Sequence, residues 1–253
     1  MTEPAAPTSA DDETTGARPP LVPALVVWWV VVEALVALTT VPTLVWLPFL
    51  EPSWVNVPLM VVLGIPVGPA LAAALFAWRR FTEDRDLSPA RHFWRGYRLN
   101  WADVLRLWVP ALVVLVLLGV NLANLRGNGA PIAFGVVGVV AAVLVAVWTL
   151  HALLVASLFS FRTGDVVRIA VFFVVAKPFA SVGALAIVGL GVAAAWFVGP
   201  WLPMALASLL TFLLWRNGMP IAEEVKRRFV VGGEARAEGG TAEGGQAAAV
   251  DED

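Results

Sequence analysis

Apolar runs long enough to cross a bilayer restrict this chain to few folds. A transmembrane helix needs about 20 consecutive apolar residues, and the runs at 22–48, 55–78, 105–125 and 131–160 all reach that length. Only 14% of the 253 residues are charged, whereas a soluble domain usually carries roughly 25%. The sequence therefore predicts an all-α fold, a polytopic membrane helix bundle.

The apolar stretch from 166 to 215 is too long to be a single span. Lys177-Pro178 and Gly199-Pro200 divide it, and proline suits the first position of a helix because the N–H that it lacks needs no partner there. The expected elements are a short cytoplasmic-side helix at 166–176, a fifth span at 179–198 and a sixth span at 201–215, the shortest of the six.

Polar tails flank the apolar region. Residues 1–20 are acidic and proline-rich, and residues 231–253 are rich in glycine, alanine and glutamate. Neither segment can bury enough apolar surface to offset its chain entropy, so we expect both to be disordered. The first tail also lacks the basic region of a signal peptide. The membrane bundle is expected over residues 21–230.

Charge indicates the orientation of the bundle, because basic residues favour cytoplasmic loops. Alternate loops of the six-span arrangement hold the basic residues: Arg79, Arg80, Arg85, Arg91, Arg95, Arg98 and Arg106, then Arg162 and Arg168, then Arg216, Lys226, Arg227 and Arg228. The opposite loops contain only Glu51 and Arg126. Scarce lysine beside abundant arginine and alanine suggests a bacterial source. We expect a multi-pass protein of the bacterial cytoplasmic membrane with both termini in the cytoplasm; no oligomeric state is predicted.

The stretch RHFWRGYRLNWADVLRLW, residues 91–108, combines arginine with aromatic residues. Ser88-Pro89 is a good helix start, and a period of 3.6 separates an aromatic face from an arginine face. We expect an interfacial helix at 88–104, with its aromatic side in the acyl boundary and its guanidinium groups among lipid phosphates. Docking of a protein partner is the alternative, and nucleic acid is disfavoured because bases need an open aromatic face. The residues expected at this surface are Arg91, Phe93, Trp94, Arg95, Tyr97, Arg98 and Trp101.

Four polar residues fall within predicted spans, where an ionisable group is costly and hence a functional candidate. Glu33 lies near the middle of the first span, His151 lies in the fourth, and Asn121 and Asn124 lie toward the outer end of the third. A contact between Glu33 and His151 could hold a shared proton. The simpler interpretation is that these side chains form hydrogen bonds that pack the helices together.

The second span contains the sequence GIPVGP. Gly64 and Gly68 form a GxxxG motif, which lets a neighbouring backbone approach closely. Pro66 and Pro69 remove backbone donors and should kink the helix. Broken helices build substrate sites in transporters, but a kink that packs against a neighbouring helix is the favoured interpretation.

Motifs of the common enzyme classes are absent from the sequence. With two histidines and no cysteine, a zinc site of the usual type is not expected. GxSxG, HExxH and the phosphate-binding GxxxxGK[ST] are missing. We expect neither catalysis nor a cofactor nor a metal.

The run GIPVGPALAAALFAWRRFTEDRDLSPARHFWRGYRLNWADVL, residues 64–104, resembles the YesL-like family of bacterial integral membrane proteins. Thr39, Thr40 and Pro42 are similar to the family's first helix end, although their order departs from it, and the resemblance extends over roughly 22–216, with 161–178 similar to the segment before the last two helices. The residues at matching positions of the family's aromatic helix are Arg91, Phe93, Trp94, Tyr97, Arg98 and Asn100.

The resemblance implies a family without an established activity, whose members often accompany carbohydrate import systems and glycan-degrading enzymes. It leads us to expect a non-enzymatic accessory component of carbohydrate uptake, with the lipid bilayer and an importer permease or other membrane protein as partners. The arginine helix and the GxxxG helix would be its docking surfaces. The alternative is a small proton-coupled carrier or channel with Glu33 and His151 in its path.

Overall fold

The computed structural model describes residues 20–84, 88–125, 127, 131–159, 161–199 and 201–227. Within these residues all regular structure is helical and there is no strand, so the expected all-α fold is confirmed. Apart from Pro20, the expected tails at 1–20 and 231–253 lie outside the described residues, as do Arg85, Arg126 and Arg228. The helices are α1 (Leu21–Thr39), α2 (Val41–Trp46), α3 (Val57–Gly64), α4 (Val67–Asp84), α5 (Pro89–Asn124), α6 (Ile132–Leu158), α7 (Thr163–Ala176), α8 (Pro178–Phe197), α9 (Trp201–Ala205) and α10 (Ala207–Val225), with 3₁₀ turns at Leu47–Phe49 and Trp54–Asn56.

Five segments of the described chain are long and apolar enough to cross a membrane, which supports a multi-pass membrane protein. They correspond to the first five predicted spans. The segments are Leu21–Thr39, Trp54–Glu83, Pro89–Asn124, Ile132–Leu158 and Pro178–Phe197.

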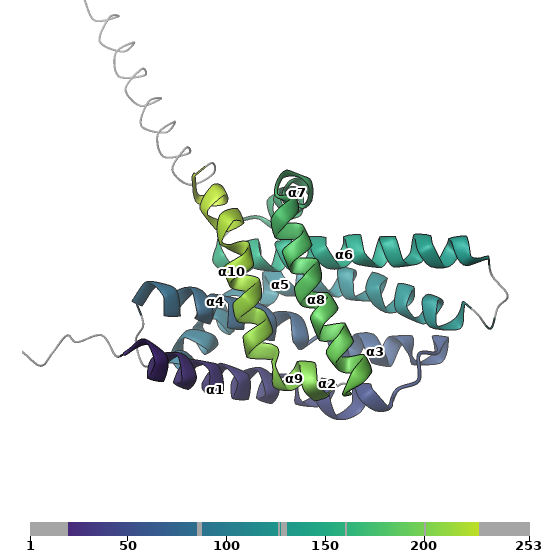
Figure 1. Ribbon diagram of the computed structural model, residues 1–253, viewed down its shortest axis with the longest axis horizontal. Helices are drawn as coiled ribbons and strands as arrows, with labels where there is room; N and C mark the ends of the chain where they lie inside the picture. Colours follow the sequence, from purple (N-terminus) through teal and green to yellow (C-terminus); the bar gives the residue numbers. More distant parts are fainter. Residues whose placement is uncertain are drawn as a thin grey trace, which may run out of the picture.

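The helices form two groups that cross. Helices α1, α5 and α6 run along the long axis of the molecule, and α8 and α10 lie across them in this view (Figure 1). Helix α4 is central, because it contacts α1, α5, α6 and α10. Its side chains Ala70, Ala73, Ala74 and Ala77 have no exposed surface. Small residues let helix backbones approach closely in a membrane bundle, so the alanine-rich sequence of α4 explains its place at the centre.

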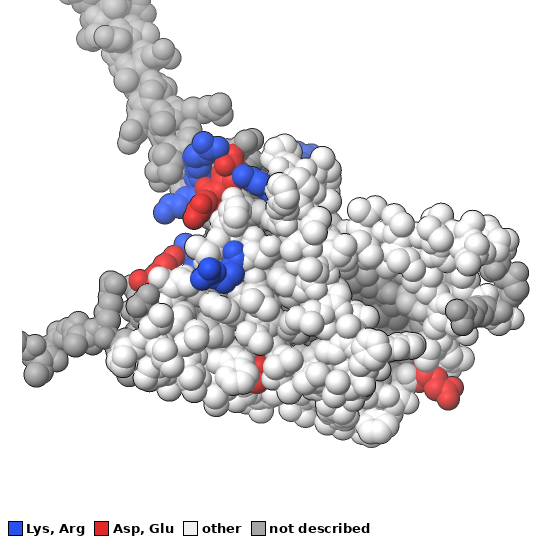
Figure 2. Space-filling model, viewed as in Figure 1, with Lys and Arg blue, Asp and Glu red and all other residues white. Residues whose placement is uncertain are grey.

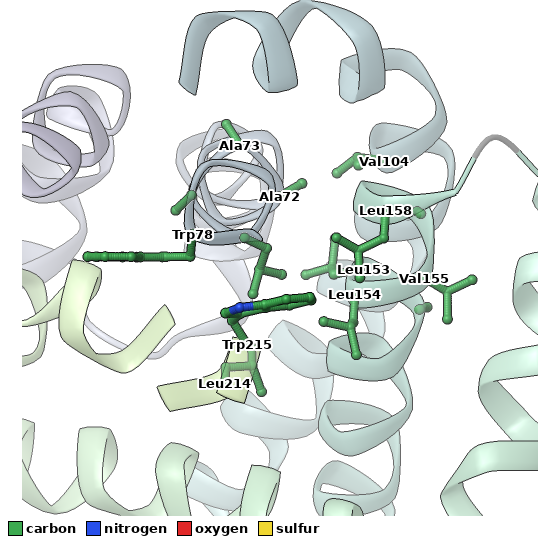
Figure 3. Packing of buried hydrophobic residues seen from close by; sticks show 14 of the residues in the cluster. Ala72, Ala73, Trp78, Val104, Leu153, Leu154, Val155, Leu158, Leu214 and Trp215 are labelled. Atoms are coloured by element: carbon green, nitrogen blue, oxygen red, sulfur yellow. The ribbon is translucent and has the colours of Figure 1, made fainter. Parts of the chain in front are cut away.

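Large side chains from the crossing pair fill the space around α4. Trp215 of α10 lies between α4 and the leucines Leu153 and Leu154 of α6 (Figure 3). A side chain built on Gly218, one turn further along α10, would collide with Leu154. This glycine therefore lets α10 pack closely against α6, which fixes where the second group of helices crosses the first.

The predicted sixth span, 201–215, is not a single helix. The chain breaks at Leu206 between the short α9 and the longer α10, and α10 continues ten residues beyond the predicted end. Its later half carries Arg216, Glu223 and Glu224, so α10 is not among the five apolar segments. Counting apolar residues missed the break because the residues on both sides of it are apolar.

The predicted separation of an interfacial helix at 88–104 from a span at 105–125 is wrong. Helix α5 is continuous over 36 residues. Pro110 lies inside it, yet a proline is tolerated in a membrane helix when neighbouring groups satisfy the freed backbone. The first predicted span also ends early, at Thr39, because the side chains of Thr39 and Thr40 donate to Leu35 O and Val36 O just before Pro42.

Charged side chains gather at one end of the molecule. Basic and acidic groups cluster near the end of α10 and beside the start of α1, and most of the remaining visible face is uncharged (Figure 2). Many large apolar side chains on α1, α6 and α8 are exposed, including Ile132 at 86% and Phe179 at 92%. Patches of this extent are rare on soluble monomers, and a lipid environment explains them.

Candidate functional site

Glu33 lies in the middle of α1 and reaches the break between α9 and α10. Its Oε2 accepts a hydrogen bond of 2.7 Å from the backbone N–H of Ser208, in the first turn of α10. The first N–H groups of a helix have no partner within the helix, and hydrocarbon offers no water to replace one. Glu33 therefore caps α10 from a different helix.

The backbone oxygen of Ser208 at this junction also has a side-chain hydrogen-bond partner. The indole Nε1 of Trp78, on α4, donates a hydrogen bond of 3.1 Å to the backbone oxygen of Ser208. Ser208 and Trp78 are both buried, and neither was a sequence-predicted site residue. Their role depends on a break in an apolar stretch that carries no turn-forming residue at Leu206, so the sequence offered little signal for it.

A groove of about 550 Å³ opens beside Glu33. It is lined by apolar and aromatic side chains, among them Trp29, Trp201 and Met204. A second cavity, of about 270 Å³, shares Ala37, Leu44 and Met204 with it and is lined mainly by aliphatic side chains. The two spaces together form an apolar region with one carboxyl group at its edge.

Three threonines line the second cavity, but their hydroxyl protons are already used. Thr40 donates to Val36 O, Thr43 donates to Leu63 O, and Thr211 donates to Ala207 O. A sugar path needs many available hydrogen-bond donors and acceptors, because a sugar carries a hydroxyl on most of its carbons. The lining of this cavity is suited to an apolar group rather than to a sugar.

His151 is 2% exposed on α6, and neither of its ring nitrogens has a hydrogen-bond partner among the described residues. Glu33 is bonded to Ser208, so the described hydrogen bonds do not connect it with His151. Asn124 donates to Pro52 O at 2.8 Å and to Val120 O at 2.7 Å, which ties the end of α5 to the loop before α3. Asn121 is exposed on α5. These hydrogen bonds do not join the four polar candidates into one site.

The GIPVGP sequence forms the junction between α3 and α4, at Ile65 and Pro66. Two carbonyl groups at the end of α3 accept hydrogen bonds from other helices. Trp108 Nε1 of α5 donates a hydrogen bond of 2.9 Å to Gly64 O, and the Thr43 hydroxyl of α2 donates a hydrogen bond to Leu63 O. Pro69 follows in the first turn of α4. The broken helix is therefore stabilised by neutral side-chain donors.

The two glycines of the GxxxG motif face α5 of the same chain. A side chain on Gly64 would come within 2.8 Å of Leu112, and one on Gly68 would collide with the ring of Trp108. The motif is thus occupied by an internal contact. This contact agrees with the favoured packing interpretation of the motif, while docking of the GxxxG helix on a partner stays a prediction.

The first half of α5 has one buried face and one exposed face. Phe93, Gly96 and Val104 are buried, and a side chain on Gly96 would lie 2.8 Å from Phe76 of α4. The expectation that the face containing Phe93 lies in the acyl boundary is therefore wrong, because this face packs against the protein core. Tyr97 is half-buried and stacks near Phe93, with ring centroids 6.4 Å apart.

The exposed face of the same segment carries the arginines. We call Arg91, Trp94, Arg95, Arg98 and Trp101 the arginine stripe, since all five are exposed and fall on one side of α5. Among the described residues, none of the three arginines has an ion pair or a hydrogen bond from its side chain. Four other arginines do have acidic partners: Arg79 and Arg80 pair with Glu83, Arg106 pairs with Asp103, and Arg227 pairs with Glu224.

One protein family matches the first part of the chain. Residues 24–122 match the family described as "Protein of unknown function, DUF624", which is the YesL-like domain. The YesL-like resemblance is confirmed over these residues. The DUF624 segment runs from α1 nearly to the end of α5, so it contains Glu33, the GIPVGP junction and the arginine stripe. No curated protein and no solved structure matches the chain.

The second half of the chain lies outside the DUF624 match. It supplies Ser208 and α10, which Glu33 caps, and it supplies His151 on α6. The matching family model is described as of unknown function, so the match assigns no reaction. Within the described part of the chain, no three histidine, aspartate or glutamate side chains are grouped so as to hold a metal ion.

Proposed function

We propose that this protein is a non-enzymatic accessory component of the bacterial cytoplasmic membrane that docks on a partner membrane protein. The observation that carries the proposal is the arginine stripe: three exposed arginines without acidic partners in the described chain, flanked by the exposed Trp94 and Trp101. Arginine and tryptophan are enriched at the energetically dominant positions of protein interfaces. An acidic surface on the partner would supply the counter-charge.

The length of α5 favours a protein partner over lipid phosphate as the group that meets the stripe. Arg106 is exposed and paired with Asp103, and the apolar part of α5 follows it. At 1.5 Å per residue, Arg91 lies about 22 Å along the helix from Arg106. The headgroup layer on each side of the hydrocarbon is only about 5–8 Å thick. A continuous α5 that crosses the bilayer near its normal therefore carries the three arginines, about 12–22 Å from Arg106, beyond the headgroups.

The neighbouring helix supports the same placement. Asn100 Nδ2 donates a hydrogen bond of 3.3 Å to Ser157 O, near the end of α6 at Leu158. The residues of the stripe that precede Asn100 therefore extend past the end of α6. Basic residues favour the cytoplasmic side, so we place the stripe and both termini in the cytoplasm.

The partner that we propose is the permease of a carbohydrate importer. This choice rests on the surroundings in which YesL-like proteins are found, and the docking surface is consistent with it. The alternative of a proton-coupled carrier gains no support from the geometry, because Glu33 serves as a helix cap and His151 is not bonded to it.

Affinity capture from the native membrane tests the proposal, with cells grown on polysaccharide and the complex fixed by crosslinking. The wild type should recover an importer permease in a stoichiometric amount. The variant Arg91→Gln/Arg95→Gln/Arg98→Gln should recover it at least about tenfold less, since a hydrogen bond to a charged group contributes roughly 1.5–3 kcal/mol.

Arg106→Gln is the matched control, because Arg106 lies on the same helix and already has a partner in Asp103. Its recovery of the permease should equal that of the wild type. Recovery of the protein alone or as a homo-oligomer would overturn the accessory role. Equal recovery by the triple variant would overturn the role of the stripe.

A further inference from the structure

A basic groove lies at the junction of α8 and α10, away from the arginine stripe and outside the DUF624 match. Its volume is about 630 Å³, and Lys177 and Arg216 both line it. Lys177 precedes the first residue of α8, and Arg216 lies midway along α10. Two cations that are 39 positions apart in the sequence therefore share one groove.

The two cations have no counter-charge in the described chain. No acidic residue lines the groove, and neither side chain forms an ion pair or hydrogen bond with another described residue. Glu224, on the same helix as Arg216, is paired with Arg227 instead. Two like charges in one groove repel each other unless an anion lies between them, so the arrangement is suited to an anionic ligand.

The groove is held open by a specific contact between the two helices. Asn217, next to Arg216, donates a hydrogen bond of 2.7 Å to Ala180 O in the first turn of α8. Gly183 lies directly against Asn217, where any larger side chain would collide. This contact fixes the register of α10 on α8 and so places Arg216 beside Lys177.

The surroundings of the groove indicate which anion it takes. It lies at the first turn of α8, a candidate membrane span of 20 residues, and the end of a span is where lipid headgroups lie. Val175, Phe179 and Val182 are 79%, 92% and 64% exposed. Val175 is near the end of α7 beside the groove, and Phe179 and Val182 extend from the groove along α8, where acyl chains would lie.

We propose that Lys177 and Arg216 bind the phosphate of an anionic phospholipid in this groove, with its acyl chains along the exposed face of α8. Basic pockets between transmembrane helices on the cytoplasmic side are suited to lipid phosphate groups. Arg216 binds the phosphate oxygens through its planar guanidinium group, and Lys177 adds a second positive charge. The site is independent of the docking role proposed for α5.

Native mass spectrometry of the full chain tests this site. The protein is released from nanodiscs that contain equal amounts of phosphatidylglycerol and phosphatidylcholine, and the retained lipids are counted. The wild type should retain phosphatidylglycerol in preference. Lys177→Gln/Arg216→Gln should lose roughly 25-fold of that preference, because each basic residue near an anionic lipid surface contributes about fivefold.

Two further variants keep the test specific. Lys177→Arg/Arg216→Lys preserves both charges and should retain most of the preference. Arg106→Gln/Arg227→Gln removes two arginines outside the groove that already pair with Asp103 and Glu224, and it should retain the preference within about twofold. A similar loss in this control pair, or no loss in Lys177→Gln/Arg216→Gln, would overturn the proposal.

A second arm separates the lipid from a soluble phosphate. In nanodiscs of phosphatidylcholine alone, the wild type is incubated with glycerol 3-phosphate. Lack of retention supports the lipid assignment. Retention by the wild type but not by Lys177→Gln/Arg216→Gln would assign the groove to a soluble phosphate ester and overturn the lipid assignment.

Discussion

Among the helix breaks in the described chain, those at the α3–α4 and α9–α10 junctions are stabilised in opposite ways. At the α3–α4 junction, the neutral side chains of Trp108 and Thr43 donate hydrogen bonds to carbonyl groups at the end of a helix. At the α9–α10 junction, the carboxyl group of Glu33 accepts a hydrogen bond from an N–H group at the start of a helix. The difference follows from helix polarity, since helix ends present free acceptors and helix starts present free donors.

The comparison also shows why a broken membrane helix need not be a substrate site. A break exposes backbone groups that hydrocarbon cannot satisfy, and packing can satisfy them without any ligand. The α3–α4 junction is buried against α5. The α9–α10 junction differs because a groove opens beside its carboxyl group. Mutations at the two junctions can separate their structural roles.

The largest effect is expected at the close contact of the α3–α4 junction. Gly68→Ala should lower the free energy of unfolding by roughly 1–3 kcal/mol, because the added methyl group would collide with the Trp108 ring in a packed interface. Thermal unfolding in detergent, followed by tryptophan fluorescence, measures the loss. Gly119→Ala on α5, where nothing lies within 4 Å, should leave the unfolding midpoint unchanged. Equal midpoints for both variants would mean that the junction tolerates separation of the helices.

The next effect is expected at Glu33. Glu33→Ala removes the cap of α10 and should cost roughly 1–2 kcal/mol, as loss of a helix cap does. Glu33→Gln retains an acceptor oxygen and should stay within about 0.5 kcal/mol of the wild type. Urea titration of the reconstituted protein compares the two variants. If Glu33→Gln is as damaging as Glu33→Ala, the negative charge rather than the hydrogen bond holds α10.

A smaller loss is expected when the neutral donor is removed at the first junction. Trp108→Phe keeps most of the apolar ring and removes the N–H that bonds Gly64 O. The free energy of unfolding should fall by about 1 kcal/mol, the net contribution of a typical hydrogen bond. Trp101→Phe is the control, since Trp101 is 54% exposed and should give no measurable change. The thermal midpoints of the two variants decide between these outcomes.

The smallest effect is expected at His151. Both of its ring nitrogens are buried without a partner among the described residues, and an unsatisfied buried polar group costs roughly 1–3 kcal/mol. His151→Leu should therefore leave the thermal midpoint unchanged or raise it. A clear fall in the midpoint would show that His151 has a partner that holds the bundle together. It would support the hypothesis that His151 shares a proton with another group.

The fold was predictable from the sequence in its main lines, and the candidate sites were predictable only in part. Five of the six expected spans correspond to apolar segments of the structure, although the first ends early and the third belongs to a helix that begins at Pro89. The sixth was misplaced, because the break at Leu206 depends on a cap from α1 rather than on a local turn signal. The period of 3.6 separated the three arginines of the stripe from the aromatic face, but it placed Trp101 on that face and the buried aromatic face was wrongly assigned to lipid.

That error has a physical cause. In a membrane protein, an apolar face is equally compatible with lipid and with the interior of the bundle. Periodicity therefore assigns Phe93 and Trp101 to one aromatic face, but it cannot show that Phe93 is buried while Trp101 is exposed beside the arginines. Gly96 was a signal that could have decided the matter, because a glycine on that face marks close approach of another helix, here at Phe76.

The sequence by itself determined the environment of this protein and most of its helices, because the need for about 20 apolar residues in hydrocarbon applies to each segment separately. The tertiary structure decided which polar groups meet. Glu33 and Ser208 are 175 positions apart, and Lys177 and Arg216 line one groove because Asn217 holds α10 against α8. Such contacts depend on how helices cross, which no single segment encodes, and they create both the capped break and the basic groove.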